Sequence, residues 1–484
     1  MMPNRRLIAT CAFLLCCNVC LLVVFSKYHT GEMFYIIIDE NQIETVILPD
    51  DFLSIGIDTS KIANTDEIDF QNERFQQLTA ALAPARLRLG GTMSDRLIFS
   101  KEDIPLKDCK RCPPNLSLDF CKKTNTKLLF SLNVLLRDDF KWDHQNSLEL
   151  IEYSKMKGFH IDWQLGNEPN SFQHVFNVTI PPKVLAHDFR HLRKLLDNHG
   201  YREALLVGPD TTRPQSSRPE CLKYMVEFLD NGSRYINVIS WHQYYLNSRT
   251  AKLDDFWNPN TFNLLKKQIY EMKEHTGKFV NLPMWLTETS SSYGGGAPGL
   301  SNSYAGSPLW VDKLGLAAKN NITTVIRQSL YGGNYSLISE QFEPLPDWWI
   351  SVIFKKLVGN EVLNIKSECS RFQRMYAHCT SRNYSNDTSA ITIFGVNLEM
   401  AKARFHLNGT AIHGNDLTID EFIISAPSNN RKSKTINLNG RPLYFESSLP
   451  DLKPRHIKYN VVSMPPYSIA FWVIKNTSIN VCKN

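Results

Sequence analysis

The chain has 484 residues, more than one simple core usually holds, so we expect two or three domains. Hydrophobic residues make up 43% of it and charged residues 21%, a balance that excludes an intrinsically disordered chain. The formal net charge of +6 fits an anionic ligand, although most mild excesses are simply solvated surface. We expect no nucleic-acid partner.

The N-terminus has the pattern of a targeting segment. Asn4-Arg5-Arg6 precedes an uncharged apolar run over residues 7–25. Residues 1–26 are therefore predicted to be a secretory signal peptide or an uncleaved signal anchor, with cleavage favoured. No later segment approaches the length of a membrane span. The rest of the chain is expected to be lumenal or extracellular, in a secreted or lysosomal protein.

Asparagine glycosylation motifs agree with that compartment. Single Asn-x-Ser/Thr triplets arise by chance, but their density behind a signal sequence is stronger evidence. The sites that we expect to carry glycans are Asn115, Asn177, Asn231, Asn321, Asn383, Asn386, Asn408 and Asn476.

Seven cysteines follow the signal segment, and an oxidising compartment favours disulfides between them. They are Cys109, Cys112, Cys121, Cys221, Cys369, Cys379 and Cys482. The odd number leaves at least one thiol or an intermolecular bridge. Cys109 and Cys112 form a C-x-x-C, but no second pair or nearby histidine completes a zinc site. A local bridge to Cys121 is favoured over metal, and we expect no metal and no cofactor.

Between about residues 52 and 330, short apolar strands alternate with amphipathic helical stretches such as 185–196 and 262–275. Eight candidate strands cover residues 53–57, 85–89, 127–132, 161–165, 204–207, 238–241, 284–287 and 323–326. These repeats predict a closed (β/α)8 barrel, an α/β TIM barrel, over residues 51–355. A doubly wound open sheet is the alternative, but no G-x-G-x-x-G or G-x-x-x-x-G-K-S/T motif follows an early strand.

The pattern changes after residue 355. Strand-like runs at 391–398, 403–407, 421–425, 434–438 and 468–474 are separated by Asn, Gly and Pro turns. They predict an appended antiparallel β-sandwich over residues 356–484. Two more strand-like runs, 33–38 and 45–48, precede the barrel. Residues 27–50 are therefore expected to join the sandwich.

Active sites of such barrels lie at the carboxyl ends of the strands, and these ends are polar in this sequence. In strand order they carry Asp58, Gly90-Gly91-Thr92, Asn133, Asn167-Glu168, Asp210, His242-Gln243-Tyr244, Glu288 and Arg327-Gln328. Any strand end becomes polar on meeting solvent, but the concentration of amides, acids and aromatics favours a sugar-binding cleft.

Two of these residues are carboxylates in motif-rich segments. Glu168 ends the fourth strand, and alone it fits a general acid as well as it fits an N-cap or a salt-bridged surface residue. Glu288 ends the seventh strand, three βα units later, so the two could face each other across the barrel mouth. Carboxylates about 5–5.5 Å apart are the apparatus of a retaining glycosidase, in which one protonates the leaving oxygen and the other attacks the anomeric carbon.

Several segments together resemble the heparanase family. They are RLGGTMSD at 88–95, WQLGNEPNSF at 163–172, VGPD at 207–210, WHQYYLNSRTA at 241–251, TETSSSYGGGAP at 287–298, PDWWISVIFKKLVG at 346–359 and MYAHCT at 375–380. The resemblance implies a barrel with a β-sandwich and an endo-β-glucuronidase that cuts internal glucuronosyl bonds of heparan sulfate with retention. Its substrate would be the chains of heparan sulfate proteoglycans.

Matched residue by residue, the resemblance implies that Glu168 is the acid/base and Glu288 the nucleophile. Asn167 matches an amide suited to the sugar 2-hydroxyl, and Arg249 matches a basic contact to sulfate or carboxylate. Cys379 and Cys482 match a disulfide. The other candidate substrate-binding residues are Asp58, Thr92, His242, Tyr244, Tyr293, Gly294, Gly295, Gly333 and Tyr335. The glycine run at 294–296 could bring backbone N–H groups to a ligand anion, although a plain flexible loop explains it almost as well.

The chain departs from the family in several places. Only residues 101–125 fill the gap where processed members carry a long excised linker, so we expect a single-chain monomer that is active without excision. The family's basic run after Gly-Pro-Asp is replaced by residues 211–218, which leaves Arg213 as the candidate cleft residue there. Gln243 replaces a second histidine after His242. Asn334 begins a further glycosylation motif, but a glycan there would crowd the cleft.

Two alternatives stay open. One is a non-catalytic heparan sulfate-binding relative, and the other is an enzyme of the same fold that acts on another glucuronide. The presence of both Glu168 and Glu288 favours catalysis.

Overall fold

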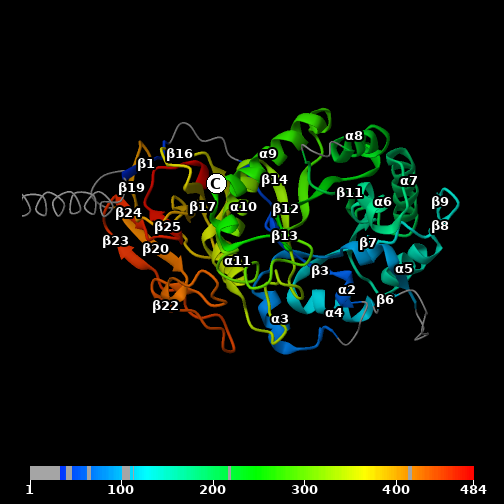
Figure 1. Cartoon of the computed structure of the whole chain (residues 1–484), viewed down its shortest axis with the longest axis horizontal. Coiled ribbons are helices and arrows are strands. Elements are labelled where there is room, and N and C mark those ends of the chain that lie inside the picture. The colour runs from blue at the N-terminus through cyan, green and yellow to red at the C-terminus, as the bar shows by residue number, and fades with distance from the viewer. Residues whose placement is uncertain are drawn as a thin grey trace, which may run out of the picture.

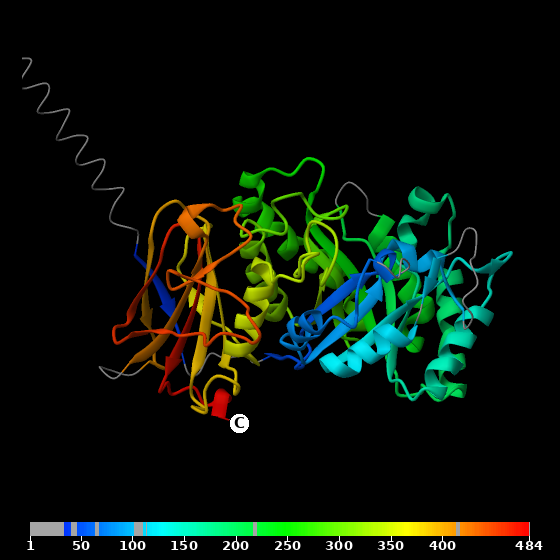
Figure 2. The same cartoon turned by 90° about the horizontal axis from the view of Figure 1, so that it is seen from below.

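The computed structural model describes residues 33–39, 46–62, 67–100, 110–112, 114–215, 220–412 and 417–483. The predicted signal segment 1–26, Cys109 and the side chains of Cys112 and Asn115 lie outside this description. A barrel and a β-sandwich lie side by side (Figure 1, Figure 2). None of the described helices is long and apolar enough to cross a membrane.

Eight parallel strands in the described residues close into a barrel, so the predicted (β/α)8 architecture is confirmed. Each strand pairs with the next along the chain, and the last pairs with the first. The strands are β3 (Leu53–Asp58), β4 (Ala85–Gly90), β7 (Thr126–Leu132), β10 (Ile161–Leu165), β11 (Leu206–Thr211), β12 (Val238–Asn247), β13 (Met284–Tyr293) and β14 (Ile322–Gln328).

Helices connect the barrel strands and cover the outside of the barrel. The longer ones are α3 (Glu73–Ala80), α4 (Pro114–Thr124), α5 (Gln145–Met156), α7 (Pro182–Asn198), α8 (Glu220–Gly232), α9 (Pro259–Thr276), α10 (Ser307–Lys319) and α11 (Pro346–Leu357). The short elements in the connections are α2 (Thr59–Ile62), α6 (Phe172–Phe176), β5 (Leu97–Phe99), β6 (Lys110–Cys112), β8 (Arg137–Asp138) and β9 (Lys141–Trp142). Helices α10 and α11 are buried along nearly their whole length because the sandwich covers them.

Two strands extend well past the ends that the apolar pattern predicts. Strands β12 and β13 continue their pairing as far as Leu246 with Ser292 and Asn247 with Tyr293. Their carboxyl halves carry buried polar residues such as His242 and Gln243, so the apolar alternation stops while the strands do not. These extensions form a wall above the carboxyl end of the barrel.

Strand β11 carries a bulge at Asp210. Pro209 pairs with Ser240 and Thr211 with Trp241, so Asp210 is an extra residue in the ladder. Its φ of +57° lies in the left-handed region. A bulge of this kind re-aims a side chain, and here it turns the Asp210 carboxylate into the barrel mouth.

The sandwich in the described residues has a nine-stranded sheet and a four-stranded sheet. The first contains β2 (Val46–Ile47), β15 (Val358–Leu363), β17 (Gln373–Thr380), β18 (Ile391–Asn397), β20 (Thr418–Ser425), β21 (Asn437–Leu438), β22 (Arg441–Pro442), β23 (Arg455–Ile457) and β25 (Ser468–Lys475). The second contains β16 (Lys366–Ser367), β1 (Met33–Ile37), β19 (Ala403–Asn408) and β24 (Val461–Met464). Strands β1 and β2 each enter one of these sheets, and Figure 2 shows β1 among strands from the other end of the chain. Strand β1 runs parallel to β19, whereas the other sandwich pairs are antiparallel.

The nine-stranded sheet is apolar on both faces because both faces are covered. In β18, Ile391 and Ile393 pack into the core between the two sheets, whereas Phe394 and Val396 belong to the core shared with the barrel. Successive residues of a strand point to opposite faces, so one strand serves both cores.

The cysteines divide into one bridge and several thiols. Cys379 on β17 is bonded to Cys482, with Cα atoms 5.4 Å apart, which is the pairing that the resemblance implied. Cys121 is a free thiol buried in the barrel core, so the predicted local bridge to it is wrong. Helix α4 places this side chain in the barrel core. Cys221 and Cys369 are also free thiols.

Candidate active site

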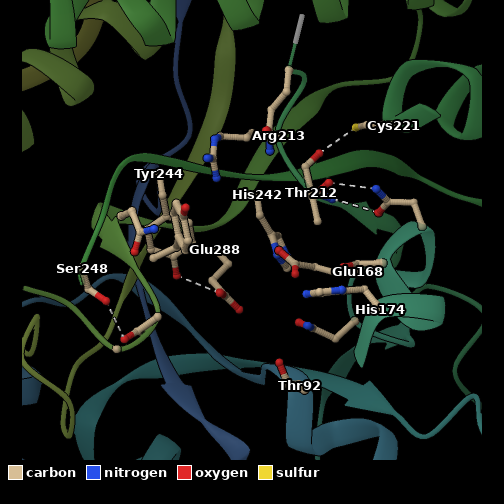
Figure 3. A pocket seen from close by; sticks show the side chains of 18 of the residues that line it. Thr92, Glu168, His174, Thr212, Arg213, Cys221, His242, Tyr244, Ser248 and Glu288 are labelled. Carbon is tan, nitrogen blue, oxygen red and sulfur yellow. Dashed lines mark hydrogen bonds and ion pairs between the residues drawn. The ribbon is translucent and has the colours of Figure 1, made fainter. Parts of the chain in front are cut away.

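A cavity of about 730 Å³ opens at the carboxyl ends of the barrel strands (Figure 3). Both carboxylates singled out by the sequence, Glu168 and Glu288, extend into it. The other predicted residues that line it are Asp58, Thr92, Asn167, Arg213, His242, Tyr244, Arg249, Tyr293, Gly294, Gly295 and Tyr335. Gly333 does not line it but lies behind Gly295, because a Cβ added at Gly333 would come within 3.1 Å of the Gly295 carbonyl oxygen.

Glu168 stands at the turn that follows β10. Its φ of +54° is in the left-handed region, and its backbone N–H donates to the Asp210 carbonyl oxygen at 3.0 Å. It precedes a 3₁₀ turn at Pro169–Ser171, but its side chain makes no capping hydrogen bond. Instead, Glu168 Oε1 lies 2.9 Å from His242 Nδ1. The N-cap interpretation therefore fails, and the left-handed turn directs the carboxylate into the cavity.

Glu288 is held from two sides within β13. The Tyr244 hydroxyl donates to its Oε1 at 2.7 Å, and Arg88 Nη1 donates to its Oε2 at 2.9 Å. Burial acts to raise the pKa of this carboxyl, but the positive charges of His242 and Arg88 and these hydrogen bonds outweigh it and lower the pKa. Glu288 is consequently an oriented carboxylate anion.

Arg88 is the buried cation that connects the strand ends. Its guanidinium donates to Gln164 Oε1, Asn167 Oδ1, Asp210 Oδ2 and Glu288 Oε2, all at 2.8–2.9 Å. A guanidinium presents several donors in a fixed plane, so one side chain sets the relative positions of four acceptors. In the sequence Arg88 stood only inside a family motif, because an arginine in the middle of an apolar strand gives no sign of its partners.

His242 lies between two carboxylates. Its Nδ1 is 2.9 Å from Glu168 Oε1, and its Nε2 is 3.3 Å from Asp210 Oδ2. Burial opposes a charge on the ring, but the negative charges of Glu288 and Asp210 and the contacts with Asp210 and Glu168 raise the pKa of His242 to about 10. Asp210 is buried as well, but Arg88 and His242 lower the pKa of its carboxyl. The ring is thus an imidazolium at neutral pH.

Asn167 has its amide orientation fixed by the Arg88 side chain and the Gly91 backbone. Its Oδ1 accepts from Arg88 Nη2 and from the Gly91 N–H at 3.1 Å. The backbone N–H of Asn167 donates to Asp95 Oδ2 at 2.9 Å. Burial raises the pKa of Asp95 to about 8, although this hydrogen bond and one from the Val134 N–H act to lower it. Because the amide oxygen is occupied, the amide nitrogen is the group left to donate to a ligand.

Two arginines lie on the rim of the cavity. Arg213 packs over the Tyr293 ring, with its guanidinium carbon 4.7 Å from the ring centroid. Arg249 follows β12, and its backbone N–H donates to Asn247 Oδ1 at 3.1 Å. Ser248 Oγ donates to the Gly294 carbonyl oxygen at 3.1 Å, which joins this turn to the glycine run. Both arginines can reach an anion in the cavity.

Other lining residues were missed by the sequence analysis. They are Asn170, Ser171, His174, Thr212, Gln215, Glu220, Cys221, Asn247 and Ser248. Thr212 and Gln215 flank Arg213, so proximity in sequence was a usable signal for them. His174 on α6 and Cys221 on α8 come from helices and gave no such signal. The Cys221 thiol donates to the Thr212 carbonyl oxygen at 2.8 Å.

Gln243 lies outside the cavity, within the barrel wall. Its Nε2 donates to Gln268 Oε1 at 3.1 Å, and its Oε1 accepts from Lys313 Nζ at 2.7 Å. Among the residues described, no group of three or more His, Cys, Asp or Glu side chains has an arrangement that could hold a metal ion.

The comparisons with known proteins agree on one family. Residues 116–315 match the family model described as Glycosyl hydrolase family 79, N-terminal domain. The chain is 34% identical to heparanase of Mus musculus over 89% of this chain and 91% of that protein. It is 27% identical to inactive heparanase-2 of Homo sapiens, over 92% and 88%. It is 28% identical to hyaluronoglucuronidase of Hirudo nipponia, over 86% and 92%.

A similar fold occurs in solved structures of distant sequence. A GH51 arabinofuranosidase from Xanthomonas axonopodis pv. citri superimposes with a TM-score of 0.68 at 12% identity, covering 92% of this chain and 99% of that one. That likeness concerns the fold alone. The sequence matches carry the assignment, and the chain therefore belongs to the heparanase family, within glycosyl hydrolase family 79.

Proposed function

We propose that this chain is a retaining endo-β-D-glucuronidase that hydrolyses internal glucuronosyl linkages of heparan sulfate. Glu168 is its acid/base and Glu288 its nucleophile. The observation that carries the proposal is that two carboxylates, from barrel strands three positions apart, enter one cavity in contrasting environments. Similarity to heparanases supports a glycoside hydrolase of this type and suggests the substrate.

The environment of Glu288 suits nucleophilic attack. Hydrogen bonds from Arg88 and Tyr244 fix both carboxylate oxygens and favour the anion. Attack on the anomeric carbon would give a covalent glycosyl-enzyme, which water then hydrolyses. As the ester forms, Glu288 loses its charge.

The charge balance of the cluster suits proton transfer by Glu168. With Glu168 protonated, the cations Arg88 and His242 balance the anions Asp210 and Glu288. When Glu288 becomes an ester, one negative charge disappears, and the cluster regains balance if Glu168 gives up its proton to the leaving oxygen. The same residue then acts as the base that activates water.

The polar groups around the pair suit an anionic sugar. The Asn167 amide nitrogen is free to donate to a hydroxyl, and Arg213 and Arg249 on the rim can bind carboxylate or sulfate. Where the family has a basic run, this chain lines the cavity with Arg213 between the neutral Thr212 and Gln215. This favours a second candidate substrate class, a less sulfated glucuronide chain.

We also propose that the protein works in the secretory pathway or outside the cell as a single-chain monomer. The predicted glycosylation sites with described side chains are all exposed, as attachment of a glycan requires. These sites are Asn177, Asn231, Asn321, Asn383, Asn386, Asn408 and Asn476. On a denaturing gel, the intact secreted form should be active as one band. Activity that appears only after proteolysis would contradict the single-chain proposal.

The test of function is digestion of size-defined heparan sulfate by wild type, Glu288→Gln and the surface control Glu274→Gln. Wild type and the control should shorten the chains internally, and Glu288→Gln should lose at least about 10³-fold in rate, as removal of a nucleophile does elsewhere. The anomeric configuration of the first product, followed by NMR, should match that of the substrate.

Each other outcome has a definite meaning. Equal activity of wild type and Glu288→Gln would remove Glu288 from the nucleophile role. Binding without cleavage by wild type would favour a non-catalytic relative. Faster cleavage of a desulfated chain than of heparan sulfate would favour the second substrate class.

A further inference from the structure

A second pocket of about 740 Å³ lies outside the catalytic cavity, between the β8–β9 hairpin and the first half of α7. We call it the hairpin pocket, and it is lined by Asp138, Phe140, Lys141, Trp142, Asp143, His144, Lys183, Val184, His187, Asp188 and His191. It shares no lining residue with the catalytic cavity. Figure 1 shows the hairpin beside α7, at the edge of the barrel farthest from the sandwich.

Both pockets lie at the same end of the barrel. The hairpin follows the carboxyl end of β7, and α7 begins after the turns that follow the carboxyl end of β10. Glu168 stands at that same end of β10. A long polysaccharide bound in the catalytic cavity can therefore extend toward the hairpin pocket without leaving this end of the barrel.

Three imidazoles gather in the hairpin pocket. His187 and His191 are one turn apart on α7, so they share a face of the helix. The ring of His144, from the segment before α5, lies 4.5 Å from the His191 ring, measured between centroids. This group is not among the arrangements that could hold a metal ion, since the described residues contain none. Protonated imidazoles carry N–H donors and positive charge, which suit an anion.

The fixed charges around the imidazoles nearly cancel. Helix α7 contributes Lys183, Asp188 and Lys194. The hairpin contributes Asp138 and Lys141, and the segment before α5 contributes Asp143. Asp188 is neutralised by Arg137 Nη1 at 2.9 Å. Asp143 accepts the Gln145 N–H at 3.1 Å at the start of α5. The protonation state of the histidines thus decides the sign of the pocket.

Protonation of the free cluster is opposed from within. Burial, followed by the charges of His144, His187 and Lys194, lowers the pKa of His191. An anion between the rings would offset that repulsion and raise the pKa of His191 again. Phe140 is 83% exposed at the pocket edge, so its ring is available to the apolar face of a sugar, whereas Trp142 is buried beneath the pocket.

We infer that the hairpin pocket binds a carboxylated or sulfated sugar unit of the polysaccharide, remote from the bond that is cleaved, and that this binding strengthens as the pH falls. The inference rests on the proposed function in so far as the ligand is the substrate of the catalytic cavity. The pH dependence assigned to this pocket comes from its imidazole cluster and does not depend on the catalytic carboxylates.

The sign of the effect follows from linkage. Binding raises the pKa of each histidine that faces the anion, so the complex holds more protons than the free protein does. Affinity therefore rises as the pH falls through the pKa values of the complex, and it levels off below those of the free protein. A histidine whose pKa rises by about one unit on binding contributes about tenfold to the affinity.

The experiment measures binding without cleavage. A heparin-derived octasaccharide is titrated calorimetrically into Glu288→Gln, and into the same chain with His144→Gln and His191→Gln added, at pH 5 and pH 8. The parent should bind at least about tenfold more tightly at pH 5 than the histidine variant does. The two should differ by less than about twofold at pH 8. Titrations in two buffers of different ionisation enthalpy should show proton uptake that the histidine variant largely loses.

A matched control removes two histidines elsewhere. His160 precedes β10 and His275 lies near the C-terminus of α9, so both are exposed at the opposite end of the barrel. Adding His160→Gln and His275→Gln should leave the pH 5 affinity and the proton uptake unchanged. Equal loss in both double variants, or no loss in either, would overturn the inference.

The proposed function and the inference fail in different ways. If wild type does not cut heparan sulfate but the histidine-dependent proton uptake is present, the function fails and the pocket stands. If wild type cuts heparan sulfate and the octasaccharide binds without that uptake, the pocket fails and the function stands. Melting temperatures of the variants show whether a loss comes from unfolding.

Discussion

Tyr244 and Arg88 hold one carboxylate from two sides, each through a different oxygen of Glu288. The tyrosine is the more informative of the two to remove, because Arg88 also supports Asp210, Asn167 and Gln164. Loss of Arg88 would therefore disturb the carboxyl ends of three strands, β10, β11 and β13, at once. Among the described residues, the Tyr244 hydroxyl donates a hydrogen bond only to Glu288.

Tyr244→Phe should lower kcat/KM and move the acidic limb of its pH profile to higher pH. A hydrogen bond to a charged group contributes about 1.5–3 kcal/mol, which corresponds to roughly 10–100-fold in rate. The hydroxyl also lowers the pKa of Glu288. Without it this pKa rises, so the nucleophile is protonated, and activity is lost, at a higher pH than in wild type. A pH series of kcat/KM on a soluble glucuronide measures both effects.

The adjacent tyrosine provides the control. Tyr245 points to the other side of β12, and its buried hydroxyl has no hydrogen-bond partner among the described residues. Tyr245→Phe should leave kcat/KM and the pH profile unchanged. An equal loss in both variants, or an acidic limb that moves to lower pH in Tyr244→Phe, would contradict the assignment.

At the scale of elements, strand ends could be predicted from the sequence, but the contacts between them could not. Period-2 apolar runs located the barrel strands, and the barrel topology then placed Glu168 and Glu288 at one rim. The bulge at Asp210, the left-handed turn at Glu168 and the extension of β12 and β13 depend on pairing with neighbouring strands. No local pattern reports such pairing, so His242 was predicted as a cleft residue but not as the ring between two carboxylates.

The loop after β13 shows how closely one element constrains another. Gly296 has φ +84°, and a Cβ there would come within 2.7 Å of the backbone of Asn334 and Tyr335. Gly299 in the same loop has φ +68° but nothing within 4 Å of an added Cβ. The two positions therefore share the cost of a left-handed residue and differ only in the close approach.

Gly296→Ala should destabilise the protein more than Gly299→Ala does, and it alone should impair catalysis. A left-handed alanine costs about 1–2 kcal/mol at either site. Overpacking adds about 1–3 kcal/mol at Gly296 and displaces Tyr335, which lines the cavity and stacks on Tyr244. Denaturant unfolding and kcat measure the two effects. Equal unfolding free energies for the two variants would show that the loop after β13 does not pack closely against residues 334–335 at Gly296.

At the scale of the whole molecule, the sandwich and the barrel are joined by buried polar contacts as well as by apolar packing. Asp312 on α10 is fully buried, and it accepts hydrogen bonds from Arg374 Nε and the Tyr376 hydroxyl, both on β17. The Tyr376 ring also lies directly over Gly315, where an added Cβ would come within 2.2 Å of it. Helix α10 is therefore fitted to the sandwich sheet, and the barrel depends on that sheet to cover it.

Arg374→Met should destabilise the whole protein by about 3–5 kcal/mol, because removal of one partner leaves a buried carboxylate without its counter-charge. Burial already raises the pKa of Asp312, and Arg374 is the main group that opposes this. In the variant the folded-state pKa rises further above the unfolded value. The loss of stability relative to wild type should then be small below the pKa of Asp312 in the unfolded chain. It should widen as the pH rises from the folded-state pKa of wild type to that of the variant.

Melting temperatures at pH 5 and pH 8 measure that widening, with Arg371→Met as the matched control. Arg371 is exposed, and the contact described for it is with the Phe372 ring, whose centroid is 5.0 Å from the guanidinium carbon. The free energy of unfolding of the control should therefore stay within about 0.5 kcal/mol of wild type at both pH values, as it does for most surface substitutions. A deficit in Arg374→Met that is the same at both pH values would mean that Asp312 is not the group left uncompensated.

If barrel activity outlasted the melting of the sandwich, the two parts would unfold independently. Loss of both in a single transition is expected, since α10 cannot keep its buried face once the sheet that covers it is gone.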